Sequence, residues 1–342
     1  MKLKAMITFS LAALILVSIL VLPTSTKANV NKAELWMTYS LSKQDTRTQV
    51  GSTLENGYDV REKIGYILAE PDSSKPTVPL YIGPSLERPE DTITTTYPLP
   101  AKETLGYIYV NQEPGTIPLY LKYDQNRNDK RTQVEAESPA GYDQGRILGY
   151  IYPTETQQLY YMPVVPKHEV YNDSGSGSDN DVSIWRAGDD VIPPGYVRAT
   201  QLAKGSYGPP SNSEFVYLLK AHQLEGQEPL LKAPSDYFFM WNDKGSGGTH
   251  DGSIWGVNCP SGYGSLGDIA TGNYSKPALS ETMCVNMDLL TTSMPTQNDW
   301  IWSDKGSGGN NDVTLFRVGN AGGFISQADY DGPKWSLFGL KK

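Results

Sequence analysis

Thirteen residues that return three times decide how this sequence folds: DSGSGSDNDVSIW at 173–185, DKGSGGTHDGSIW at 243–255 and DKGSGGNNDVTLF at 304–316. Each copy starts at an Asp, turns through Gly-Ser-Gly, carries a second Asp eight residues after the first and ends on a bulky aromatic residue. Such short apolar runs bounded by Gly-rich turns predict strands. Three copies predict closure about a pseudo-threefold axis, because one unit alone is too small to bury its apolar face.

The two Asp positions of each copy suggest two roles. A Gly-Ser-Gly segment lets the backbone turn back sharply, and a flanking carboxylate can accept its amide hydrogens. We therefore expect the first Asp of each copy to lock its turn: Asp173, Asp243 and Asp304. The second Asp and the aromatic residue are candidate ligand-binding residues, as a carboxylate and a ring that could hold a sugar: Asp181 with Trp185, Asp251 with Trp255, and Asp312 with Phe316.

Alternatives to the ligand-binding role remain at this point. The aromatic residues are core residues by default, and the loops could hold Ca²⁺, although none has the dense alternating acids of an EF-hand. The chain has no Gly-x-Ser-x-Gly nucleophile elbow. With three His and two Cys, a zinc site of several such ligands is hard to build. We therefore predict no catalytic residue, no metal ligand set and no cofactor.

A different phrase repeats in the first half of the chain. IGYI at 64–67 returns as LGYIY at 105–109 and at 148–152. An apolar–aromatic pair precedes the first copy and follows each copy: Leu35-Trp36, Leu80-Tyr81, Leu119-Tyr120 and Leu159-Tyr160. We predict an all-β protein of two pseudo-threefold blocks, a trefoil- or prism-like block at 29–165 and a β-prism-like block at 166–342. The boundary is placed at the short segment between Pro163 and Pro166.

Composition supports the all-β class and limits the partners. The chain of 342 residues has 33 Gly, 24 Pro and 22 Tyr, which is typical of many short strands joined by tight turns. Its formal charge is −9, with 29 basic against 38 acidic residues. A protein this acidic is poorly suited to binding phosphate backbones, so we expect no nucleic-acid partner.

The first 28 residues have the pattern of a secretory signal peptide. Lys2 and Lys4 precede an apolar run at 5–22, and small residues Thr26 and Ala28 stand at the −3 and −1 positions of a cleavage site after Ala28. An uncleaved membrane anchor is the alternative. We expect a secreted, extracellular protein. Export favours a disulfide between Cys259 and Cys284, with two buried thiols as the alternative.

The middle copy of the second repeat carries a family resemblance. Its landmarks are DGSIW at 251–255, CPSGY at 259–263, LGD at 266–268, Lys276-Pro277, Cys284 and Asp288-Leu289. From about Tyr171 to Leu340 the chain resembles the Vps62-related family, a domain of unknown function. The resemblance implies a β-prism that acts as a binding module without a catalytic residue, with some relatives in insecticidal proteins. The first block resembles a tandem repeat of secreted bacterial proteins.

Three functions follow as hypotheses. The first is a secreted, non-enzymatic, lectin-like protein that binds cell-surface glycans. The second is a toxin or virulence factor that acts on host membranes, with peripheral membrane contact or a membrane receptor. The third is a glycan hydrolase built from acids alone, which the sequence does not support over any other pair of its 38 acidic residues.

Overall fold

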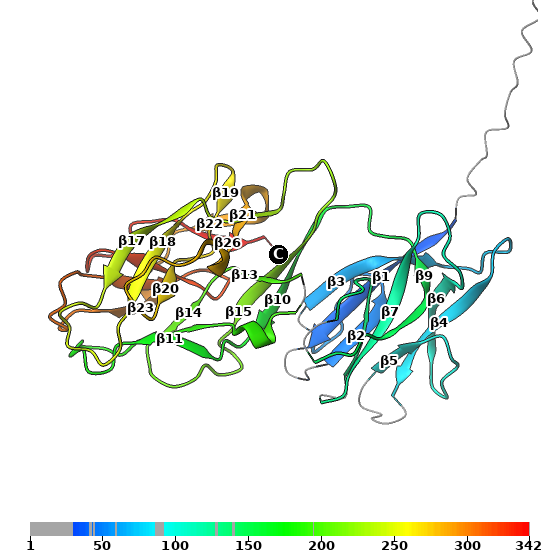
Figure 1. Cartoon of the computed structure of the whole chain (residues 1–342), viewed down its shortest axis with the longest axis horizontal. Helices are drawn as coiled ribbons and strands as arrows, with labels where there is room; N and C mark the ends of the chain where they lie inside the picture. Colours follow the sequence, from blue (N-terminus) through cyan, green and yellow to red (C-terminus); the bar gives the residue numbers. More distant parts are fainter. Residues whose placement is uncertain are drawn as a thin grey trace, which may run out of the picture. The chain divides into compact units, whose positions relative to one another are not determined.

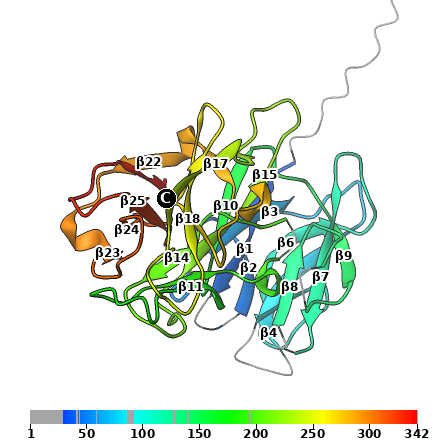
Figure 2. The ribbon, with the colours of Figure 1, turned by 60° about the vertical axis from the view of Figure 1, so that its left-hand side comes forward.

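The computed structural model describes residues 30–40, 43, 45–58, 60–85, 92–126, 129–138, 141–193 and 195–341. The predicted signal peptide at 1–28 lies outside these residues. The described part consists of β-strands with short 3₁₀ turns, which confirms the predicted all-β class. Asn31–Lys342 form one compact unit, drawn in Figure 1 and from a second side in Figure 2.

Strands β1 to β9 form one group, coloured blue to green in Figure 1. Their bounds are β1 (Lys32–Ser40), β2 (Asp45–Val50), β3 (Val60–Leu68), β4 (Thr77–Pro84), β5 (Thr92–Thr95), β6 (Glu103–Tyr109), β7 (Ile117–Asp124), β8 (Asp129–Gln133) and β9 (Arg146–Ile151). Each of β1, β4 and β7 pairs antiparallel with the two strands that follow it in the chain. The group is therefore three three-stranded units of one design.

The inner strands β3, β6 and β9 join the three units to one another. They meet pairwise at Leu68 with Tyr107, Tyr109 with Tyr150, and Tyr66 with Tyr152. Each inner strand has a glycine where a neighbouring strand crosses closely: Gly65, Gly106 and Gly149. A Cβ atom on any of these would lie 2.4–2.5 Å from a backbone oxygen of the adjoining strand. The repeated Gly-Tyr-Ile phrase is thus what allows the units to close around a common axis.

The core of this first group repeats with the same period. Each unit contributes four buried aliphatic side chains, two from its first strand and two from its inner strand: Leu35, Met37, Ile64, Ile67; Leu80, Ile82, Leu105, Ile108; and Leu119, Leu121, Leu148, Ile151. A β-bulge follows the buried Leu of each first strand, at Leu35/Trp36, Leu80/Tyr81 and Leu119/Tyr120. Burial of one shared core, which no unit could form alone, stabilises the group.

The strands from β10 onward form a second group of small sheets. Their bounds are β10 (Gln158–Val164), β11 (His168–Asn172), β12 (Ser183–Arg186), β13 (Val197–Arg198), β14 (Leu202–Lys204), β15 (Val216–His222), β16 (Leu231–Lys232), β17 (Asp236–Asn242), β18 (Ser253–Asn258), β19 (Tyr263–Gly264), β20 (Ile269–Thr271), β21 (Cys284–Asn286), β22 (Leu290–Ser293), β23 (Trp300–Ser303), β24 (Thr314–Arg317), β25 (Phe324–Gln327) and β26 (Leu337–Leu340). Four 3₁₀ turns lie among them: η1 (Asp189–Val191), η2 (Leu279–Glu281), η3 (Met287–Leu289) and η4 (Gln297–Asp299).

Each of the three repeats in this group supplies two sheets. The sheets β11-β12-β14, β17-β18-β20 and β23-β24-β25 carry the thirteen-residue phrase on their central hairpins. The sheets β10-β15-β13, β16-β21-β19 and β22-β26 complete the repeats. Two core clusters follow from this arrangement, one around Trp241 and Trp302 and one around Leu219 and Val285.

The pairing of the strands places the start of the second group at β10 (Gln158), several residues before the predicted boundary at 165/166. β10, which contains the Leu159-Tyr160 pair assigned to the first block, pairs along its whole length with β15 of the second group. Gln158 faces His222 and Val164 faces Val216 in this register. The pair resembles Leu80-Tyr81 in sequence but begins the second group, because its hydrogen-bonding partner lies about sixty residues later in the chain.

The predicted disulfide is confirmed. Cys259 and Cys284 are bonded, with their Cα atoms 5.7 Å apart. Cys259 follows β18 and Cys284 begins β21, so the bond links the two sheets of the middle repeat.

Candidate functional site: a ring of three loops

The first Asp of each thirteen-residue phrase closes its own loop. Asp173, Asp243 and Asp304 are buried, and the Oδ1 atom of each accepts a hydrogen bond from the backbone N–H nine residues later. The donors are Val182 at 2.9 Å, Gly252 at 3.1 Å and Val313 at 2.8 Å. These are the contacts that a turn-locking role requires.

The same carboxylates also join neighbouring repeats. Trp241 Nε1 donates to Asp304 Oδ2 at 2.8 Å, and Trp302 Nε1 donates to Asp173 Oδ2 at 3.0 Å. Burial raises the pKa of Asp173 and of Asp304, although the hydrogen bonds that they accept oppose the rise. Asp173 and Asp304 are therefore both the locks of their loops and acceptors for a buried indole of another repeat.

The first repeat has Tyr171 where the other two have Trp241 and Trp302. The three rings pack edge to face, with centroids 5.7 Å apart for Tyr171–Trp241 and for Trp241–Trp302. The ring of Tyr171 lies against Gly252, where a Cβ atom would come within 2.2 Å of it. The glycine in the second repeat, where the sister repeats have Val182 and Val313, thus makes room for this tyrosine.

A cycle of backbone hydrogen bonds holds the three loops together. Thr249 N–H donates to Ser174 O at 2.9 Å, Asn310 N–H donates to Lys244 O at 2.9 Å, and Asp179 N–H donates to Lys305 O at 2.8 Å. In all three cases the donor is the seventh residue of its phrase, and the acceptor is the second residue of the phrase that precedes it in the cycle. We call loops 173–182, 243–252 and 304–313 the loop ring.

The predicted stacking residues Trp185, Trp255 and Phe316 are buried, with 5%, 9% and 1% of their surface exposed. The two indole N–H groups donate to Ser183 Oγ and Ser253 Oγ, both at 2.8 Å. A ring enclosed in this way has no free face for a sugar. The structure thus argues against the predicted stacking role and places these three residues in the core.

The second Asp of each phrase lies at the surface. Asp181, Asp251 and Asp312 are all exposed. Tyr274 donates to Asp251 Oδ1 at 2.8 Å and Tyr330 donates to Asp312 Oδ1 at 3.0 Å, while in the first repeat Tyr207 donates to Asp173 Oδ1 at 2.9 Å. Tyr207 and Tyr330 are 43% and 44% exposed. The aromatic neighbours of the surface acids are therefore tyrosines that sequence reasoning missed.

A sequence signal for these tyrosines exists but is weak. Each lies in a Gly-containing turn after its phrase: KGSYG at 204–208, GNYSK at 272–276 and ADYDG at 328–332. The spacing from the second Asp differs in every repeat, so only the fold shows that the three positions correspond.

The tyrosines are held as neutral donors. Desolvation, and then hydrogen bonds to the nearby carboxylates, raise the pKa of Tyr207, Tyr274 and Tyr330 above the ordinary value. A hydroxyl that keeps its proton holds the facing carboxylate in one orientation. The remaining acceptor positions of that carboxylate stay available to a ligand hydroxyl.

Two further features of the described residues bear on the site. No group of three or more His, Cys, Asp or Glu side chains among them is placed to hold a metal ion. None of the helices in this part of the chain is long and apolar enough to cross a membrane.

Comparisons with known proteins find a matching family model and a solved structure with partial similarity. Residues 158–322 match the family model described as Vacuolar protein sorting-associated protein 62. No curated protein matches the chain. A solved structure, GNIP1Aa from Chromobacterium piscinae, is 27% identical with a TM-score of 0.43, and the match covers 51% of this chain. The matched part spans about a third of that protein's length, 34%.

The family match begins at Gln158, the first residue of β10, as the strand pairing does. It ends at Gly322, within the third repeat. The resemblance to the Vps62 family that the sequence predicted is thereby confirmed over residues 158–322.

Proposed function

We propose that this chain is a secreted recognition protein without enzymatic activity, which binds cell-surface glycans through the surface acids of the loop ring and the tyrosines beside them. The observation that carries the proposal is the pairing of exposed Asp251 and Asp312 with Tyr274 and Tyr330 on loops that are hydrogen-bonded to one another. Sugar hydroxyls donate strongly to carboxylates, and the apolar face of a sugar packs on an aromatic ring.

Multiplicity also supports this function. A single shallow Asp–Tyr pair would bind a sugar weakly, because few groups are immobilised around the ligand. Two or three such pairs on one rigid set of loops can engage a branched or clustered glycan together, which raises the overall affinity without any new contact. The locked loops hold the pairs in place, so little conformational entropy is lost on binding.

A glycan array probed with residues 29–342 tests the proposal. We expect binding to a defined set of glycans, and a loss of about tenfold or more in the Asp251→Asn/Asp312→Asn variant, which keeps an acceptor for each tyrosine but removes the charge. Asp190→Asn is the matched control, since Asp190 is exposed and lies outside the loop ring. A folded protein that binds no glycan would contradict the proposal.

A second function is a toxin or virulence factor that contacts host membranes. It is favoured by Met294 and Trp335, which are 52% and 57% exposed, with Ser336 Oγ 3.2 Å from Met294 Sδ. Large apolar side chains at the surface insert into the lipid interface. Binding to liposomes and release of an enclosed dye distinguish this function from glycan recognition alone.

A further inference from the structure

A pocket of about 290 Å³ lies between the second and third repeats of the Vps62-family region. Its walls are mainly apolar and come from β17, β18, β25 and β26 and the segment before β25: Phe238, Val257, Val318, Ile325, Leu337 and Phe338. This volume lies just below the range for sites of drug-sized molecules, roughly 300–1,000 Å³, and therefore suits a smaller ligand. The pocket is separate from the residues of the loop ring.

The pocket contains one buried carboxylate, Asp268, which is 8% exposed. Its Oδ2 atom accepts hydrogen bonds from Ser326 N–H at 2.7 Å and Ser326 Oγ at 2.5 Å. Within the described residues, Oδ1 accepts no hydrogen bond and Asp268 has no ion pair with a Lys, Arg or His. The described residues that line the pocket include no basic side chain. Among the described residues, the charge of Asp268 therefore has hydrogen-bond donors on one oxygen but no cationic partner.

The first repeat shows that a neutral side chain can make the contact between repeats that Asp268 makes with Ser326. Gln201 occupies the corresponding position, where its Oε1 accepts from Ala270 N–H at 2.8 Å and its Nε2 donates to Ala270 O at 3.1 Å. A neutral amide thus joins the first repeat to the second in the way that Asp268 joins the second to the third. A buried charge that a neutral side chain could replace is costly unless something pairs with it.

The wall beside this position also differs between the repeats. His168 faces Arg186 across the β11–β12 hairpin, whereas Phe238 faces Gly256 at the same place in β17–β18. A Cβ atom at Gly256 would come within 2.2 Å of the Phe238 ring, so the glycine allows the ring to lie flat over the strand. His168 and Arg186 of the first repeat thus correspond to Phe238 and Gly256 of the second, so the second repeat has an aromatic ring and no basic side chain at this place.

We propose that this pocket binds a small organic cation, a protonated primary amine carried on an apolar body. The ammonium group donates to Asp268 Oδ1, and the apolar body packs against Phe238, Val257 and Phe338. Such a ligand supplies the positive charge that the buried carboxylate lacks. The aromatic walls add cation–π attraction and apolar contact, which a fully hydrated cation could not use.

Binding to a carboxylate in this setting depends on pH. Desolvation by burial raises the pKa of Asp268 to about 6, opposed by the hydrogen bonds from Ser326. The other ionisable residue lining the pocket is Tyr263, whose hydroxyl donates to Glu228 Oε1 at 2.8 Å, and Cys259 is held in the disulfide. The affinity for the amine therefore falls as the pH decreases through about 6, because Asp268 becomes neutral.

Calorimetric titration with 2-phenylethylammonium at about pH 7.5 tests the inference, with the uncharged 2-phenylethanol as the comparison ligand. We expect saturable binding of the amine, and binding of the alcohol about tenfold or more weaker. Asp268→Asn should lose the preference for the amine, since an amide cannot pair with a cation. Asp190→Asn, an exposed acid outside the pocket, should bind the amine as the unmodified protein does.

Two results would overturn the inference: equal affinity for the amine and the alcohol, or unchanged amine affinity in Asp268→Asn. The titration of the unmodified protein at about pH 5 gives a second measurement that needs no variant, and unchanged affinity there would also contradict it. A cooperative thermal unfolding transition of Asp268→Asn reports that the variant is folded. The inference does not depend on the function proposed for the loop ring, so either can fail alone.

Discussion

Asp268 lowers the stability of the folded protein at neutral pH. Burial raises its pKa from 3.8 to about 6, so the folded state holds this proton more tightly than the unfolded state does. Between these two values the folded state binds more protons, and the free energy of unfolding therefore decreases as the pH rises. Above about pH 6 the whole penalty applies, which for a pKa difference of this size is about 3 kcal/mol.

Replacing Asp268 by Asn should therefore stabilise the protein. At about pH 7 we expect the free energy of unfolding to increase by up to about 3 kcal/mol, because the uncharged amide removes the cost of a buried charge. Near pH 2.5, below the pKa in both states, the carboxyl is protonated whether the protein is folded or unfolded, and the difference should be close to zero. Urea unfolding of both proteins at the two pH values measures this. A less stable variant at neutral pH would show that the charge has a structural partner.

At the scale of the element, the loop ring depends on glycines placed against the neighbouring loop. Gly306 has a φ of +90°, and a Cβ atom there would lie 2.8 Å from Asp179 Oδ1 and 3.2 Å from Gly177 O. Gly308, two residues later, has a φ of +71° and no atom within 4 Å of its added Cβ. The two positions share the backbone conformation but differ in whether a second loop approaches.

Substitutions at Gly306 and Gly308 distinguish the cost of backbone strain from the cost of a steric clash between repeats. Gly308→Ala should cost about 1–2 kcal/mol, the cost of an L-residue in the left-handed region. Gly306→Ala should cost that amount and a further ~1–3 kcal/mol, because its methyl group forces the loops apart. Thermal melting of the two variants gives the comparison. Equal melting temperatures would show that the contact between loops adds little to stability.

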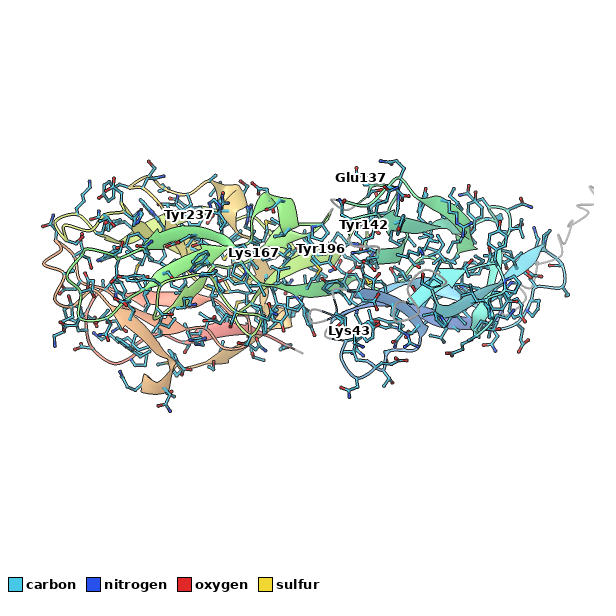
Figure 3. All side chains as sticks on the ribbon, turned by 90° about the horizontal axis from the view of Figure 1, so that it is seen from below. Lys43, Glu137, Tyr142, Lys167, Tyr196 and Tyr237 are labelled. Atoms are coloured by element: carbon cyan, nitrogen blue, oxygen red, sulfur yellow. A yellow bond between two sulfur atoms is a disulfide. The ribbon has the colours of Figure 1, made fainter. Side chains whose placement is uncertain are left out.

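At the scale of the whole molecule, a buried cluster of charges links the two groups of strands. Lys220 of β15 donates to Glu62 of β3 at 2.6 Å and also to Glu135, which follows β8. Tyr196, labelled in Figure 3, donates to Glu62 Oε2 at 3.2 Å. Burial opposes the charge on Lys220, but the two carboxylates raise its pKa above the ordinary value. The ammonium group thus neutralises acids of the first group from a strand of the second.

Lys220→Met should destabilise the protein by about 3–5 kcal/mol, because it removes the ammonium group from Glu62, which is buried, and from Glu135, which is partly buried. Lys232→Met is the matched control. Lys232 pairs with Glu228 at 2.6 Å at the surface, where such pairs contribute about 0–1 kcal/mol. Urea unfolding measures both variants. If the two losses were equal, the buried cluster would contribute no more than a surface ion pair.

The sequence by itself determined the features that repeat within a short window. The three Gly-Tyr-Ile phrases and the three Asp phrases predicted strands and turns, and hence the all-β class, because alternation and turn residues act locally. The family resemblance over the second group and the disulfide between Cys259 and Cys284 were also predicted from their residues. The first Asp of each phrase was identified as a turn residue since its acceptor and donor lie within one loop.

Only the tertiary structure decided which residues of different repeats meet. Leu159-Tyr160 matched the first repeat in sequence, yet β10 pairs with β15. The sequence predicted that three aromatic residues stack on a ligand, but packing between sheets buries them: Trp185, Trp255 and Phe316. The aromatic residues beside the surface acids are instead tyrosines from later turns. Asp268, which has no cationic partner among the described residues, meets Ser326 of the third repeat for the same reason. Each of these outcomes depends on contacts between segments far apart in the chain, which local periodicity does not specify.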